Sequence, residues 1–173
     1  YGDASLLTIE IRADMLRGFA ARYAKQQHTP LELDLRELRR LADQKLVPAI
    51  KELLAKYRTH HDVRHLLLRL IREGKLKDCG EIALEFVRDG DADEYSRICG
   101  IQIIAASGTA EEKRQLRGIT LDNVVAKDRA LLAAVVHALY PTHLSIEEMG
   151  DLLEAAPYSR DSAYDELQQV VIG

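Results

Sequence analysis

The residues best suited to chemistry lie in the motif His-His-Asp-Val-Arg-His at residues 60–65. His61 and His65 stand four positions apart, so on a helix both imidazoles would lie on one face and could share a metal ion. A catalytic zinc needs a third protein ligand and a general base, and no glutamate stands inside the spacer. A metal-dependent helical hydrolase using His61, Asp62 and His65 therefore stays an alternative. The favoured interpretation is a helix cap beside a surface histidine.

The dyad of His61 and Asp62 also resembles the metal-binding dyad of HD-type phosphohydrolases. Such enzymes need another histidine upstream and another aspartate downstream, and His28 and Asp128 would fill these places only if they were chosen for the purpose. Asp62 is equally suited to cap a helix, because a carboxylate accepts hydrogen bonds from the first free N–H groups. We therefore predict no catalytic, cofactor-binding or metal-ligating residue, and no cofactor.

A second candidate group consists of three arginines, Arg36, Arg39 and Arg40, which could bind the phosphates of a nucleic acid. Residues 1–60 carry 11 Lys/Arg and 8 Asp/Glu, whereas residues 91–173 carry 7 and 14. An acidic C-terminal half would repel a nucleic-acid backbone, whose neutralisation supplies most non-specific affinity. A helical nucleic-acid-binding adaptor using the three arginines is thus a second alternative, and we expect no nucleic-acid partner.

The elements that must position these groups are predicted to be helices throughout. Residues 8–26 form a helix with one apolar stripe of period 3.6. A short helix follows Pro30, a break falls at residues 44–47, and a third helix tolerates Pro48 near its start. The predicted stripe of the first helix comprises Ile11, Met15, Leu16, Phe19, Ala20 and Tyr23.

From residue 60 the chain begins to repeat. Asp62, Asp93, Asp128 and Asp161 each stand where an apolar helix would start, at intervals of 31, 35 and 33 residues. Each of the first three helices precedes a break and a second helix, at residues 76–87, 110–117 and 144–155. The last of these opens with a Ser-x-x-Glu capping box.

A repeating helix pair of ~30–40 residues is typical of an α-solenoid. We predict an all-α protein with an N-terminal three-helix segment at residues 1–59. Residues 60–173 are predicted to form HEAT-like repeats in a right-handed α-solenoid of stacked helix pairs, the last one truncated. The alternative is an irregular helical bundle with evenly spaced caps.

Bulk properties agree with a folded helical protein. The chain has 173 residues, of which 47% are hydrophobic and 30% charged, too apolar for intrinsic disorder. Cys79 and Cys99 are expected to be buried thiols. No apolar run reaches the ~20 residues that span a bilayer, and no secretory signal pattern opens the chain. We expect a cytoplasmic location, and the apolar run at residues 170–173 leads us to expect a segment of a longer protein.

Residues 127–153 contain the phrase Ala-Leu-Tyr-Pro-Thr-His-Leu-Ser, an apolar helix that ends in a proline turn before a capped second helix. This stretch resembles the helical repeats of large bacterial NACHT-like (STAND-class) NTPases. The resemblance implies a sensor or scaffold region that binds a partner and regulates an ATPase carried elsewhere. We therefore expect a non-enzymatic segment with a protein partner, of basic character given the acidic region, and neither a membrane nor a small-molecule substrate.

Overall fold

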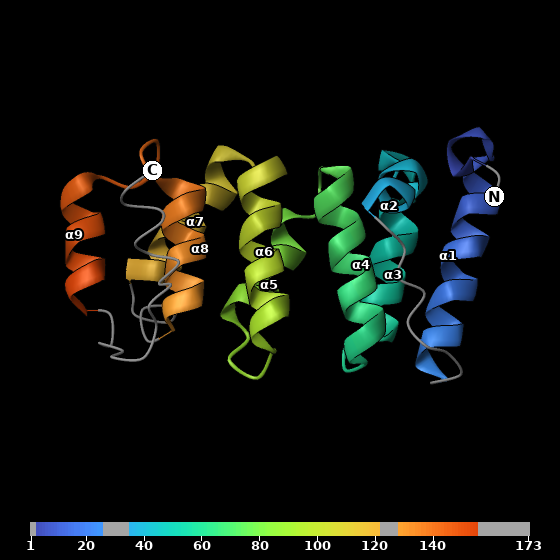
Figure 1. Cartoon of the computed structure of the whole chain (residues 1–173), viewed down its shortest axis with the longest axis horizontal. Helices are drawn as coiled ribbons and strands as arrows, with labels where there is room; N and C mark the ends of the chain where they lie inside the picture. Colours follow the sequence, from blue (N-terminus) through green and yellow to red (C-terminus); the bar gives the residue numbers. More distant parts are fainter. Residues whose placement is uncertain (1–2, 26–34, 122–127, 156–173) are drawn as a thin grey trace. The chain divides into compact units, whose positions relative to one another are not determined.

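A computed structural model describes residues 3–25, 35–121 and 128–155, and these residues are helical without a strand (Figure 1). The all-α prediction is thereby confirmed. Two short 3-10 helices, η1 (Ala4–Leu6) and η2 (Gln44–Leu46), accompany the α-helices. The α-helices are α1 (Ile9–Ala24), α2 (Leu35–Leu41), α3 (Val47–Lys56), α4 (His61–Gly74), α5 (Gly80–Arg88), α6 (Glu94–Ser107), α7 (Ala110–Leu121), α8 (Arg129–Leu139) and α9 (Ile146–Ala155).

The chain divides into two compact units, residues 1–79 and 80–173. The first holds α1 to α4 and the second holds α5 to α9. The boundary predicted at residues 59 and 60 was drawn from sequence repetition rather than compactness, and it stays a prediction. The predicted break at residues 28–30 and the fourth repeat at Asp161 lie outside the described residues.

In the first unit, two helices begin at residues whose side chains favour a helix start. Thr8 caps α1, and Pro48 stands in the first turn of α3, where its missing N–H costs nothing. Helix α1 contacts α3 and α4, and α4 also contacts α2 and α3. The fully enclosed side chains of this unit are Leu16, Ala20, Leu38, Leu46, Ile50, Leu53, Leu54, Val63, Leu67, Leu68, Leu70 and Ile71.

The predicted stripe of α1 is wrong at its first member. Ile11 is 47% exposed, whereas the neighbouring Arg12 is 7% exposed. Leu16 and Ala20 are buried as predicted. The apolar face begins with Ala13 rather than Ile11. Arg12 is buried because its guanidinium donates to the carbonyl oxygens of Leu7 and Ser5, which the periodicity of apolar residues does not reveal.

The connection between α4 and α5 is longer than predicted. Lys75 takes a left-handed conformation with φ of 46°, and the Leu76 N–H donates to the Ile71 carbonyl at 3.1 Å, as in a Schellman cap. Asp78 is also left-handed, with φ of 62°. A helix cannot run through such residues, so the predicted start at residue 76 is wrong and α5 begins at Gly80.

In the second unit, two of the predicted aspartate caps are confirmed. The Asp93 carboxylate accepts from the Ser96 N–H at 2.9 Å, and Asp128 accepts from Ala130 and Leu131 at 3.0 and 3.1 Å. Helix α6 contacts α5 and α8, while α7 contacts α5, α6 and α8. The buried apolar residues that fill this unit are Ala83, Leu84, Phe86, Val87, Cys99, Ile101, Ile103, Ile104, Leu116, Leu131, Leu132, Val135, Val136, Leu139 and Leu144.

Capping boxes open both α7 and α9. The predicted one joins Ser145 and Glu148, whose side chains each accept the other's backbone N–H at 3.2 and 3.0 Å. A second box joins Thr109 and Glu112 in the same way, at 3.2 and 2.6 Å. Helix α7 was predicted to end at residue 117, and it continues to Leu121.

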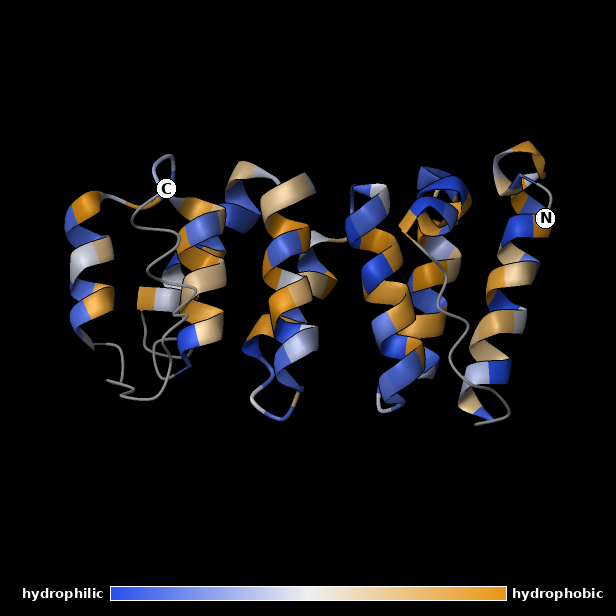
Figure 2. Cartoon of the chain, viewed as in Figure 1, coloured by the Kyte–Doolittle hydropathy of each residue, from blue (hydrophilic) through white to orange (hydrophobic). Residues whose placement is uncertain are grey.

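Polar and apolar residues interleave along the helices that face the viewer in Figure 2. Cys79 and Cys99 are completely buried, as predicted. None of the helices within the described ranges is long and apolar enough to cross a membrane.

Candidate functional site

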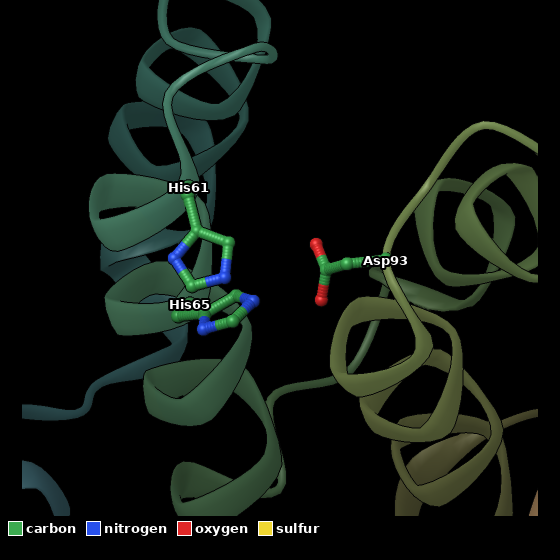
Figure 3. Close-up of side chains that lie close together, drawn as sticks. All are labelled: His61, His65 and Asp93. Atoms are coloured by element: carbon green, nitrogen blue, oxygen red, sulfur yellow. The ribbon is translucent and has the colours of Figure 1, made fainter.

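The His61 and His65 side chains lie on the same side of α4, one turn apart (Figure 3). Their ring centroids are 3.7 Å apart, with 50° between the ring planes. A ring nitrogen of each lies within 4.8 Å of one of the other. The four-residue spacing therefore places two imidazole ligands on one face of the helix, as the sequence predicted.

Asp62 is not the cap that the sequence predicted. Helix α4 begins one residue earlier, at His61, and its N-cap is His60, whose side chain makes no capping hydrogen bond. Asp62 stands in the first turn, where its charge still opposes the positive end of the helix dipole. Its Oδ1 lies 3.2 Å from His61 Nδ1. Because an ionised carboxylate can only accept, the His61 Nδ1 carries the hydrogen of this bond.

His60 adds a third imidazole at the start of α4, with a different environment. Its Nδ1 is shielded from solvent, and no hydrogen-bond partner reaches it from the part of the chain that the structure describes. Such a nitrogen loses its water without replacement, which costs free energy. His60 therefore weakens the start of this helix where Ser, Asp or Asn would strengthen it.

An HD-type site would add His28 and Asp128 to His61 and Asp62. His28 lies outside the described residues. Asp128 begins α8 in the second unit, and its carboxylate already accepts the N–H groups of that helix. Asp93, also drawn in Figure 3, belongs to the second unit, where it caps α6 and accepts from the Ser96 hydroxyl at 2.9 Å.

The arginines of α2 point outward, as predicted, and Arg36, Arg39 and Arg40 are all exposed. Arg39 donates to the Glu73 carboxylate at 3.0 Å, and Arg72 contacts the same carboxylate at 2.9 Å. Burial raises the pKa of Glu73, but the hydrogen bonds and charges of Arg72 and Arg39 outweigh it, so this pKa is lowered. One of the three cations thus already pairs with a carboxylate of α4, although its side chain is 62% exposed.

Arg12 is the charged residue that sequence reasoning missed. Its Nε donates to the Leu7 carbonyl at 3.1 Å, and one Nη donates to the Ser5 carbonyl. The other Nη lies 3.7 Å from the Asp43 carboxylate. The guanidinium therefore joins the segment before α1 to the loop before α3. No local signal in the sequence distinguishes it from a surface arginine.

Among the acidic side chains of α9, one makes an ion pair and a capping hydrogen bond, and others are exposed. Glu148 contacts Arg117 and accepts from Ser145, and the Ser145 N–H and then Arg117 lower the pKa of Glu148. Asp151 and Glu154 are exposed on the same helix.

Comparisons with known proteins provide no relative. No protein-family model, no curated protein and no solved structure matches the chain.

Proposed function

We propose that this chain is a non-catalytic helical-repeat segment that binds a protein partner within a larger regulatory NTPase. The observation that carries the proposal is the order of helix contacts inside each unit. In the first unit α1 contacts α3 and also α4, and α2 contacts α4; in the second unit α5 contacts α7 and α6 contacts α8. This alternation supports an α-solenoid, in which every second helix belongs to the same layer.

We also propose that the solenoid is right-handed with HEAT-like repeats, and that it is part of a larger NTPase. The latter proposal rests on the resemblance of residues 127–153 to NACHT-like repeats. Solenoids present extended surfaces made of stacked helices, a shape that serves binding better than reaction chemistry. The exposed carboxylates of Asp151 and Glu154, in a region with twice as many acidic as basic residues, favour a basic protein as the partner.

Small-angle X-ray scattering tests the architecture. A monomer with a radius of gyration well above the ~16 Å of a compact domain of this length supports the solenoid. A monomer at ~16 Å contradicts it and favours a closed helical bundle.

A lysine-rich fluorescent peptide tests the surface by anisotropy at low and high salt. We expect the double variant Asp151→Lys/Glu154→Lys to weaken binding at least ten-fold. The control is Glu81→Lys/Asp91→Lys, which makes the same change in net charge at exposed positions elsewhere in the second unit. Equal losses in the two variants would show a general charge effect, and they would refute a binding surface on α9.

A further inference from the structure

Beyond the proposed scaffold role, we propose that the exposed His61 and the half-buried His65 of α4 form a binding site for a divalent ion of the zinc class. The site is contained in one helix, so that the fold of α4 alone preserves the spacing of its two ligands. Imidazole nitrogen suits Zn²⁺, Ni²⁺ and Cu²⁺, and it discriminates against Mg²⁺ and Ca²⁺, which prefer oxygen.

The distances permit chelation after a small adjustment. Zinc–nitrogen bonds of ~2.0–2.1 Å in tetrahedral geometry put the two nitrogens roughly 3.4 Å apart. Ring nitrogens of His61 and His65 lie within 4.8 Å of one another, so a closure of at most about 1.4 Å is required. The His61 side chain is 61% exposed. The tilted contact of the two rings already holds them on one side of the helix (Figure 3).

Asp62 supplies the outer support that metal-binding histidines usually have. Its carboxylate accepts the Nδ1–H of His61 at 3.2 Å. That hydrogen bond selects the tautomer in which Nε2 carries the lone pair, so Nε2 is the nitrogen that binds the ion. A carboxylate behind a ligating imidazole also raises its basicity. Two protein ligands leave further coordination positions for water.

Zinc titration of the chelator-treated chain of residues 1–173 tests the site, with calorimetry for affinity and mass spectrometry for stoichiometry. We expect one ion per chain, and an affinity at least ten-fold weaker in both His61→Ala and His65→Ala. Asp62→Asn should weaken it by about ten-fold, the lower end of the usual effect of such supporting groups. Imidazole ¹⁵N spectra should identify His61 Nε2 as the coordinating atom.

The control is His137→Ala, because His137 is an exposed histidine of α8 with Ala133 and Pro141 four positions away instead of a second imidazole. This variant should bind as the wild type does. Circular dichroism should show that the His61 and His65 variants keep their helix content, since both side chains lie outside the apolar core. Absence of zinc binding in the wild type, or equal binding by the His61→Ala/His65→Ala double variant, would overturn the proposal.

Discussion

Gly100 is the position at which a single methyl group should test the packing of the second unit. It lies in the middle of α6, where alanine would ordinarily gain about 1 kcal/mol over glycine. A Cβ at Gly100, however, would stand 2.7 Å from the Ala83 carbonyl oxygen and 3.0 Å from a Val87 methyl group. The first of these neighbours is backbone of α5, so the two helices must separate to admit the methyl group.

Overpacking of this kind costs about 1–3 kcal/mol. After subtraction of the propensity gain, Gly100→Ala should lower the free energy of unfolding by about 1 kcal/mol. The matched control is Gly118→Ala in α7, where a Cβ meets nothing within 4 Å. There the propensity gain is unopposed, and stability should rise by about 1 kcal/mol.

Urea denaturation followed by circular dichroism at 222 nm measures both changes, and the two variants report on the same unit. The expected difference between them is about 2 kcal/mol, well above the error of the method. If Gly100→Ala were as stable as Gly118→Ala, the close approach of α5 and α6 would be refuted.

Three further perturbations address the first unit. Arg12→Ala should lower the stability by about 2 kcal/mol, because it removes charge-assisted hydrogen bonds, and Arg12→Lys should rescue little of the loss in a thermal melt. His60→Ser should raise stability by about 1 kcal/mol by supplying the missing cap of α4; an unchanged melting temperature would contradict this. The lowered pKa of Glu73 means that its ion pairs stabilise the fold above the ordinary value of 4.5 and that this contribution is lost as pH falls through the lower folded-state pKa. Glu73→Gln should therefore reduce stability at pH 7 by less than about 1 kcal/mol, and this loss should shrink as pH falls below 4.5, as measured by melting at a series of pH values.

Much of the helical structure could be predicted because its causes are local. Asp93, Asp128 and the pair of Ser145 and Glu148 mark helix starts through bonds that span only two or three residues. Two local predictions were nevertheless wrong: the helix cap at Asp62 and the helix start at residue 76. In the first case His60 took the cap position without offering a hydrogen bond, and in the second the left-handed Asp78 kept the residues before Gly80 out of the helix.

The pair of candidate metal ligands was visible in the sequence as a four-residue spacing, but the orientation of the two imidazole rings was not. That His61 and His65 approach to 3.7 Å, with Asp62 against Nδ1, depends on side-chain rotamers that spacing does not specify. The ion pair of Arg39 with Glu73 joins residues 34 positions apart, and it was equally invisible.

The sequence by itself determined that this protein is helical, where most helices begin and, apart from the first turn of α1, which of their faces are apolar. Those properties follow from hydrogen bonds and side-chain periodicity within one or two turns of chain. The tertiary structure alone decided that Arg12 is buried while Ile11 is exposed, and that α5 and α6 meet at Gly100. Such features depend on which segments pack together, and no local pattern contains that information.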